Sequence, residues 1–206
     1  MKRIRTFIAL NLPLAVINKV AEVQAQLKEV AANQRLHVGW VPPANIHVTL
    51  KFLGEIPEES VLAVSDLLGE RLSSRAAIPV TVKGVGAFPV PQNPRVLWVG
   101  VQSEDDSLTA LAKDVDTWLA ELGFPEESRK FHPHLTLGRV KQRGKETVDV
   151  IEQIGTATGL SLFETIEELS NKMIDQTVAK EVVIYRSDLQ RHGAEYTPLT
   201  KVFLET

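Results

Sequence analysis

Two stretches of the chain carry the same short pattern of polar residues. Residues 45–54 read NIHVTLKFLG and residues 133–140 read PHLTLGRV, so both contain the tetrapeptide His-x-Thr-Leu. An imidazole can gain or lose a proton near neutral pH, and a threonine hydroxyl can donate a hydrogen bond to an anionic oxygen. Two imidazoles and two hydroxyls brought together would therefore suit acid–base chemistry on an anion. The residues concerned are His47, Thr49, His134 and Thr136.

Strand geometry indicates which of these side chains share a face. Alternate side chains of a strand point to the same side and lie about 6.6 Å apart. In the first copy, His47, Thr49 and Lys51 would form one face, and in the second copy His134 and Thr136 share a face in the same way. The apolar face of the first copy would consist of Ile46, Val48, Leu50 and Phe52. A polar row inside a core would be costly, so both polar faces should line water or a polar ligand.

Hydrolysis of a cyclic phosphate is a reaction that two such histidines can carry out. A neutral imidazole takes a proton from the attacking water, and an imidazolium gives a proton to the departing sugar oxygen. A pKa near 6.5 lets both forms coexist near neutral pH. Threonine hydroxyls two residues away can donate to the phosphoryl oxygens as charge builds up in the transition state.

Four blocks in order along the chain resemble a known family. They are RTFIAL at 5–10, the block 40–54 with the first histidine, PHLTLGR at 133–139, and YRSDL at 185–189 with Gly193 and Tyr196. Together they resemble the two-histidine (2H) phosphoesterases, closest to the RNA 2′,3′-cyclic phosphodiesterase branch, also called LigT-like proteins or 2′-5′ RNA ligases. Four blocks in the family order are far more specific than either triplet.

The resemblance implies an α+β fold, in which residues 1–206 form a single bilobal unit with pseudo-twofold symmetry. Two antiparallel sheets would flank a central cleft, with helices outside and one His-x-Thr strand from each lobe facing the cleft. By the family's roles, His47 is the proton donor to the 3′ oxygen and His134 the base that activates water, which leaves a 2′-phosphate. Thr49 and Thr136 hold the phosphate, together with Arg139. Members also run a related reaction backwards, joining RNA ends through a 2′-5′ linkage, and the resemblance implies no metal and no cofactor.

Arg139 departs from the expected strand pattern. Strict alternation from His134 puts it on the apolar face of Leu135 and Leu137, so a phosphate contact requires a bulge near Gly138. Weaker substrate-binding candidates are Phe7, Lys51 and Tyr196. Phe7 shares the face of Arg3 and Arg5 and would stack on a base, although a core phenylalanine is equally compatible with the pattern. Lys51 would contact phosphate unless it is a solvated residue at the cleft edge, and Tyr196 would otherwise be a core residue.

Other histidines and basic residues have simpler interpretations. His132 and His134 form a His-x-His pair typical of metal ligands, but no further ligands follow at suitable spacing, so His132 is interpreted as an exposed turn residue. His37 and His192 lie in loop-like surroundings. A basic cluster could steer RNA, although a solvated charge run is the commoner explanation. The cluster consists of Arg139, Lys141, Arg143 and Lys145.

Composition bounds the class of protein. The chain has 206 residues, 44% of them hydrophobic and 24% charged, with a net charge of −3 and no cysteine. The absence of cysteine excludes disulfides, thiolate zinc sites and a cysteine nucleophile. No stretch approaches the roughly 20 apolar residues of a transmembrane helix, so a cytoplasmic protein, acting as a monomer, is expected. The expected partner is an RNA with a 2′,3′-cyclic phosphate end, tRNA fragments among them, or a nucleoside 2′,3′-cyclic phosphate.

The elements that must position the two motifs follow from periodicity. Strands are expected at 3–10, 45–53, 78–86, 95–101, 133–141, 180–187 and 196–204, and helices at about 13–30, 58–74 and 105–122. Residues 145–178 read as short helical pieces, with a strand at 159–163 and Ile166, Leu169, Met173 and Ile174 at helical spacing. Two other functions fit the same residues: a phosphodiesterase of small cyclic nucleotides or 2′-5′ linkages, and a nucleotide- or RNA-binding module without turnover.

Overall fold

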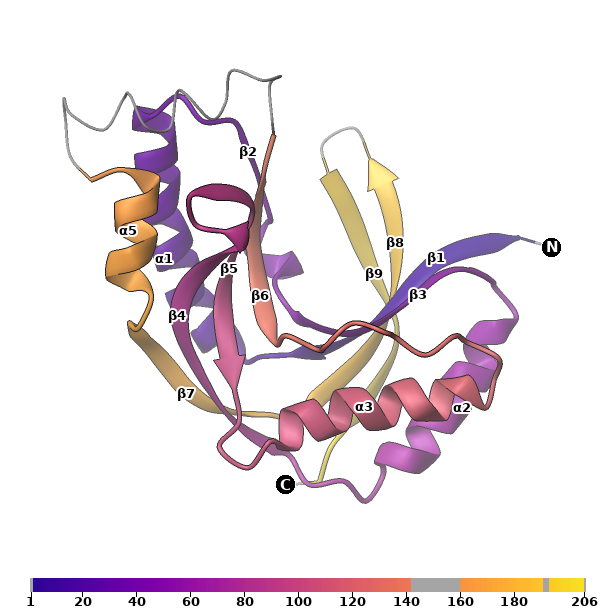
Figure 1. Cartoon of the computed structure of the whole chain (residues 1–206). Helices are drawn as coiled ribbons and strands as arrows, with labels where there is room; N and C mark the ends of the chain where they lie inside the picture. The colour runs from indigo at the N-terminus through magenta and orange to yellow at the C-terminus, as the bar shows by residue number, and fades with distance from the viewer. Residues whose placement is uncertain (1, 142–159, 191–192, 206) are drawn as a thin grey trace.

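A computed structural model describes residues 2–141, 160–190 and 193–205 and gives an α+β fold dominated by antiparallel strands (Figure 1). The strands are β1 (Arg3–Asn11), β2 (Val38–Trp40), β3 (Val48–Pro57), β4 (Ile78–Val90), β5 (Asn93–Gln102), β6 (His134–Val140), β7 (Met173–Ala179), β8 (Glu181–Gln190) and β9 (Gly193–Phe203). The helices are α1 (Leu14–Asn33), α2 (Ser60–Leu72), α3 (Ser107–Ala120), α5 (Leu162–Leu169) and the 3-10 turn η1 (Pro43–Asn45).

The strands form one curled sheet made of two halves. Its order is β7-β4-β5-β6-β3-β1-β8-β9, with β2 added to β6. The two halves expected as separate sheets are joined at a single residue pair between β3 and β6, Val48 with Leu135. In Figure 1 the half with β4, β5 and β6 and the half with β1, β3, β8 and β9 rise as two arms from this junction. The arms are the two lobes of the bilobal α+β fold.

Helices pack on the outer sides of both arms. The first helix agrees with the helix expected at about 13–30 and starts directly after Pro13, whose fixed φ suits a helix start. It packs against β7 and α5, whereas α2 and α3 lie under the other arm, against β3 and β9 (Figure 1). The residues of α1 that are buried by this packing are Val16, Ile17, Val20, Val23, Gln24, Leu27 and Ala31.

The region after the second motif differs from the sequence-based expectation. The expected strand at 159–163 is wrong, since α5 begins at Leu162 behind the N-cap Ser161. Ser161 and Glu164 form a reciprocal capping box, which stabilises the start of a short helix. Met173 and Ile174, expected at helical spacing, lie instead in the edge strand β7, where main-chain pairing with β4 overrides the apolar period. Arg143, Lys145 and His192 lie outside the described residues.

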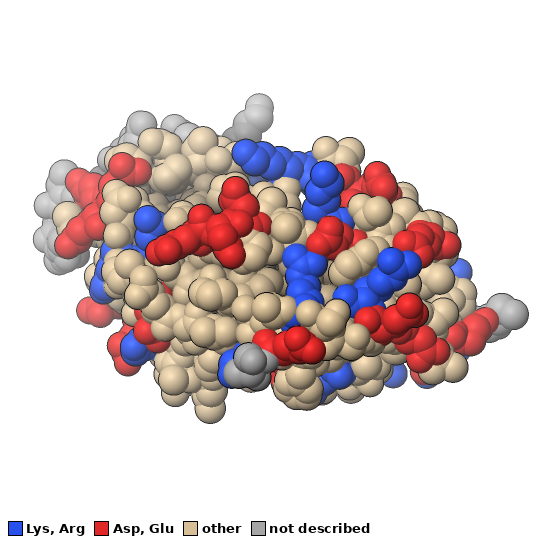
Figure 2. All heavy atoms as spheres, turned by 90° about the horizontal axis from the view of Figure 1, so that it is seen from below, with Lys and Arg blue, Asp and Glu red and all other residues tan. Residues whose placement is uncertain are grey.

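Charge on the helical underside is mixed. Seen from below, acidic and basic side chains are intermingled over this face (Figure 2). Such a mixture is typical of a solvated surface rather than one built to hold a polyanion. Among the described residues, no helix is both long and apolar enough to cross a membrane.

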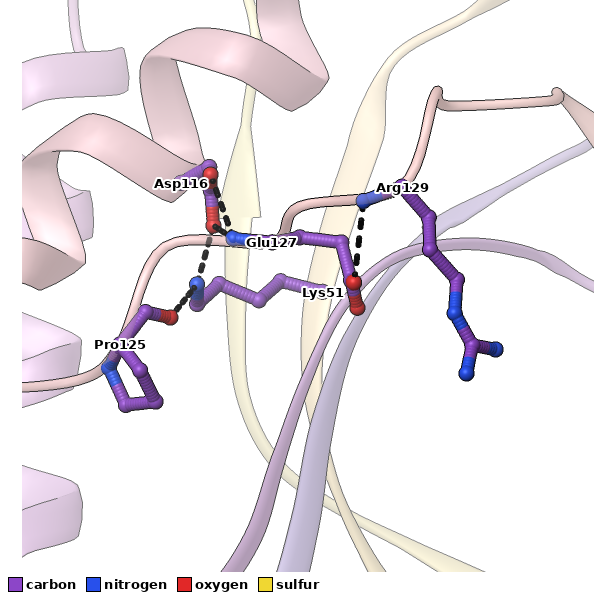
Figure 3. Close-up of polar contacts among 5 residues, drawn as sticks. All are labelled: Lys51, Asp116, Pro125, Glu127 and Arg129. Atoms are coloured by element: carbon purple, nitrogen blue, oxygen red, sulfur yellow. Dashed lines mark hydrogen bonds and ion pairs between the residues drawn. The ribbon is translucent and has the colours of Figure 1, made fainter.

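A buried ion pair fastens β3 to α3. The Lys51 ammonium contacts the carboxylate of Asp116 and donates to the carbonyl of Pro125 at 2.7 Å. Asp116 also accepts from the backbone N–H of Glu127 at 3.0 Å, so one carboxylate holds both the strand and the segment leading to β6 (Figure 3). The side chains of Lys51 and Asp116 are only 5% and 19% exposed. This pair therefore ties β3 to the segment that precedes the second motif.

We expect Lys51→Ala to lower the free energy of unfolding by about 3 kcal/mol, because it leaves the Asp116 carboxylate buried without its cation. Urea denaturation monitored by circular dichroism measures the change. The control is Lys2→Ala, which breaks the exposed pair with Glu58 at 3.0 Å and should cost under about 1 kcal/mol. Equal losses in the two variants would contradict the structural role of Lys51.

Candidate active site

The two His-x-Thr motifs lie side by side, in antiparallel directions, at the junction of the arms. Val48 and Leu135, the middle residues of the motifs, pair in antiparallel register. Continuing that register by one residue places His47 beside Thr136 and Thr49 beside His134. In a regular ladder, diagonal residues such as the two histidines lie about 7–8 Å apart. On this extended register the four polar side chains would share one face, opposite the buried side chains of Val48 and Leu135.

His47 is held within a group of aromatic rings. Its imidazole stacks on Phe7 with a centroid distance of 4.8 Å and meets the edge of Tyr196 at 5.4 Å. Burial lowers the pKa of His47 to about 4; a hydrogen bond to the backbone carbonyl of Asn45 opposes this shift, and the charge of His134 adds to it. His47 is therefore neutral at pH 7 in the free protein.

His134 has a matching arrangement on the other arm. Its Nδ1 lies 2.7 Å from the carbonyl oxygen of His132, two residues back, just as His47 bonds to the carbonyl two residues before it. A carbonyl only accepts, so Nδ1 carries the proton and Nε2 holds the lone pair. The ring meets the edge of Phe88 at 5.2 Å. Burial is the main cause that lowers the pKa of His134, and the positive charges of His132 and Arg139 lower it further.

The electrostatic coupling joins the two rings in one site. The charge of His134 lowers the pKa of His47, so a proton on one imidazole disfavours a proton on the other. Thr49 and Thr136 lie half-buried between them. The site thus holds one mobile proton more readily than two, as a pair of acid and base groups requires.

Arg139 reaches the same face because β6 carries a bulge. Trp98 of β5 pairs with Thr136 but Leu97 pairs with Gly138, which leaves Leu137 as an extra residue. The extra residue reverses the alternation, so Arg139 shares the face of Thr136. A phosphate contact by Arg139 required a bulge near Gly138, and the structure contains that bulge.

A second bulge, in β3, exchanges the faces of the sheet on which Lys51 and Phe52 lie. Ile8 of β1 pairs with Lys51 and Ala9 with Thr49, so Leu50 is the extra residue. Lys51 turns to the helical side, where it meets Asp116 (Figure 3), and Phe52 turns to the face of Thr49. The expectation that Lys51 faces the cleft and Phe52 the core is therefore wrong. Phe52 is 62% exposed.

Phe7 supports the site from beneath. It is only 3% exposed, and the rings of His47, Phe52, Tyr185 and Tyr196 lie around it. Of the two interpretations of Phe7, stacking on a base is wrong because its ring is already covered, and the core position is confirmed. One face of the ring packs against His47.

Tyr196 lies at the rim, half-buried, with its ring 5.4 Å from His47.

Sequence reasoning missed several residues that shape the site, and the reasons differ. Tyr185 belongs to a matched block but gave no sign of its place beside His47, with ring centroids 5.8 Å apart. The Trp98 indole packs over Gly86 of the paired strand β4, where any Cβ would collide with it. That glycine was a sequence signal for the position of Trp98. Phe88, also in β4, packs against the Trp98 ring.

Comparison with known proteins identifies the family of this chain. The family model described as LigT-like phosphoesterase matches residues 12–98 and 99–167. The chain belongs to the LigT-like phosphoesterases. One relative of this family, the RNA 2′,3′-cyclic phosphodiesterase of Archaeoglobus fulgidus, is 38% identical over 72% of this chain and 80% of its own. Another with that name, from Aquifex aeolicus, is 32% identical over 99% of both chains.

A solved structure shares the fold of this chain. The protein TT0787 of Thermus thermophilus superposes with a TM-score of 0.75 at 26% identity and covers 97% of both chains. Within residues 2–141, 160–190 and 193–205 of this LigT-like chain, no three His, Cys, Asp or Glu side chains gather as metal ligands would.

The depressed pKa of His47 predicts a pH-dependent stability. Between pH 6.5 and about 4 the unfolded chain binds a proton that folded His47 does not, so the free energy of unfolding should fall as the pH falls across this window. Urea denaturation at pH 7 and pH 5 measures the slope. His47→Gln should flatten it, whereas His37→Gln, which alters an exposed histidine, should not. An unchanged slope in His47→Gln would contradict the assigned pKa.

Proposed function

We propose that this protein hydrolyses 2′,3′-cyclic phosphate ends of RNA to 2′-phosphates by two-histidine acid–base catalysis. The observation that carries the proposal is the antiparallel pairing of Val48 with Leu135, which sets two imidazoles and two hydroxyls on one face. The names of the relatives from Archaeoglobus fulgidus and Aquifex aeolicus support the same reaction.

Phosphate binding falls to the hydroxyls and the guanidinium. Thr49 and Thr136 donate hydrogen bonds to the two non-bridging phosphoryl oxygens from the two sides of the central pair. Arg139, on the same face, adds a cation near the developing negative charge. Its charge also disfavours a proton on His134, which keeps that ring available as a base.

The chemical step moves two protons in opposite directions. Nε2 of His134 takes a proton from water, whose oxygen forms a bond to phosphorus as the bond to the 3′ oxygen breaks. The electron pair of that bond goes to the 3′ oxygen, which receives a proton from His47. A 2′-phosphate and a 3′-hydroxyl result, and the protons on the two histidines are reset by exchange with solvent.

Substrate binding explains how His47 becomes an acid. In the free protein its pKa is about 4 because the ring is buried. A phosphodiester carries a negative charge, and an opposite charge within a few ångströms raises the pKa of an imidazole. His47 therefore gains its proton together with the anion, and the proton leaves with the 3′ oxygen. The pocket that desolvates the ring also makes that proton easy to transfer.

Further parts of the proposal concern the setting of the enzyme. We place it in the cytoplasm as a monomer in which residues 1–206 form one bilobal unit, acting on RNA ends such as those of tRNA fragments, with no metal or cofactor. The same groups could join ends through a 2′-5′ linkage in reverse. Phosphodiesterase activity on small cyclic nucleotides or 2′-5′ linkages is the alternative enzyme, and a binding module without turnover the alternative outside enzymes.

His47→Ala should bind a nucleoside 2′,3′-cyclic phosphate yet hydrolyse it at least about 100-fold more slowly, the usual scale for a lost acid–base group. Turnover is followed by chromatography, which also identifies the phosphomonoester formed. His37→Ala serves as the control and should keep wild-type turnover. Turnover of His47→Ala at the control rate would exclude His47 as the acid, and a 3′-phosphate product would reverse the assigned direction.

Hydrolysis should continue in EDTA, because protons on His47 and His134 carry the chemistry. Rates are compared before and after dialysis against the chelator, with zinc and manganese added back separately. A rate that disappears with EDTA and returns with either metal would show that the reaction needs a metal ion.

A further inference from the structure

A buried glutamine on helix α1 contacts the strand that carries the second motif. Gln24 is only 1% exposed and lies among the apolar residues that α1 packs toward the sheet. Its amide nitrogen donates to the carbonyl oxygen of Leu137 at 2.8 Å and to the carbonyl oxygen of Val41 at 2.7 Å. Both N–H groups of the amide are therefore paired, and they tie two backbone segments to one helix.

Leu137 is the extra residue of the bulge in β6. The neighbouring strand β5 pairs with Thr136 and Gly138 and leaves Leu137 out of the register. Because Leu137 is fully buried, its carbonyl needs protein donors in place of water. A second donor to this carbonyl, besides Gln24, is the backbone N–H of Val41 at 2.9 Å. The bulge is thus held by α1 and by the segment that leads to the first motif.

The direction of Arg139 depends on this bulge. Strict alternation would put Arg139 on the face of Leu135, which is a fully buried residue of the core. With the extra residue in place, Arg139 lies on the face of Thr136 and is exposed there. A guanidinium is costly to bury without a partner, so a strand without the bulge offers no favourable place for this side chain. The geometry of the bulge and the position of the cation are therefore coupled.

The other arm has a comparable arrangement. Asp116 of α3 binds Lys51, which follows the bulge of β3, and accepts from the backbone N–H of Glu127 in the segment that leads to the second motif (Figure 3). Gln24 of α1 binds the bulge of β6 and the carbonyl of Val41 in the segment that leads to the first motif. In each arm, one polar side chain of a packed helix joins a bulge to the segment before the other motif. Two such contacts at corresponding places indicate that both bulges need a fixed geometry.

We propose that Gln24 is a positioning residue: its amide fixes the bulge of β6, and the bulge keeps the Arg139 guanidinium directed toward the phosphate. The inference rests on the proposed function, in which Arg139 lies beside the negative charge that develops on the phosphoryl oxygens. Gln24 acts through the backbone and makes no contact with the substrate. Without its two donors, the carbonyls of Leu137 and Val41 lose a hydrogen bond each, and the bulge loses the contact that holds it to α1.

Turnover of a nucleoside 2′,3′-cyclic phosphate tests the coupling of the two residues. Gln24→Met removes both donors but keeps an unbranched side chain of similar length, and kcat/KM should fall about 10-fold, the scale of a lost hydrogen bond. Arg139→Gln should lower kcat/KM about 100-fold, the scale of a lost hydrogen bond to a charged group. In the double variant, Gln24→Met should cost under about 2-fold beyond Arg139→Gln, because two residues that act through one contact are not additive.

Gln34, the C-cap residue of the same helix, offers a matched control. It is 6% exposed, and its side-chain oxygen accepts from the backbone N–H of Leu162 at 2.9 Å. Gln34→Met therefore removes a hydrogen bond of a buried glutamine without touching β6, and it should keep kcat/KM within about 2-fold of the wild type. Both glutamine variants should lower the midpoint of urea denaturation, which separates the loss of stability from the loss of turnover.

Titration of the His134 imidazole by NMR tests the position of Arg139 without any turnover. Burial is the main cause that lowers the pKa of His134, and the charges of His132 and Arg139 lower it further. Gln24→Met and Arg139→Gln should both raise the pKa of His134, because each takes the cation away from the ring. The double variant should match Arg139→Gln, and Gln34→Met should keep the wild-type pKa.

An unchanged pKa of His134 in folded Gln24→Met, or additive losses of kcat/KM in the double variant, would overturn the positioning role. Gln24→Leu, which also lacks donors, repeats both measurements if Gln24→Met does not fold. Absence of hydrolysis by the wild type would overturn the proposed reaction alone. In that case a raised pKa of His134 in Gln24→Met would still support the control of Arg139 by Gln24.

Discussion

The whole site depends on one backbone pair, Val48 with Leu135, where the two halves of the sheet meet. A junction this narrow leaves both arms free to curl while it holds the two motifs in strict antiparallel register. Since register in a strand determines which face each side chain takes, this pair aligns the two motifs so that their histidines and threonines lie on the same side. The helices and the buried ion pair of Lys51 with Asp116 then hold the arms around it.

The surroundings of the two histidines divide their roles. Their backbone contacts are alike, since each ring forms a hydrogen bond with the carbonyl two residues before it. Their neighbours differ: His47 stacks on Phe7 and has its pKa depressed to about 4, whereas His134 lies near the cation Arg139. In the proposed reaction, a phosphate anion bound between the two rings relieves the repulsion between them, so protonation is coupled to the binding of substrate.

Sequence patterns predicted most of the elements and the two motifs because those depend on local periodicity. The helix α1 and the strand that follows His47 could be found in this way, although the strand was expected from residue 45 and begins at Val48, after the 3-10 turn Pro43–Asn45. The faces of Lys51 and Phe52 could not, because one extra residue at Leu50 reverses alternation and no residue type announces it. The choice between base stacking and core packing for Phe7 could not be made for a different reason: its burial depends on Tyr185 and Tyr196, which are distant in sequence. Local sequence patterns cannot reveal neighbours that are distant along the chain.

The two bulges fall at the same place in both copies of the motif, on the leucine of His-x-Thr-Leu, Leu50 in one and Leu137 in the other. Each turns the residue two positions later toward the shared face: Phe52 on one arm and Arg139 on the other. Equivalent backbone positions thus present an aromatic ring and a cation. A molecule lying across the twofold axis therefore meets unlike ends, so that its two orientations in this nearly symmetric frame are not equivalent.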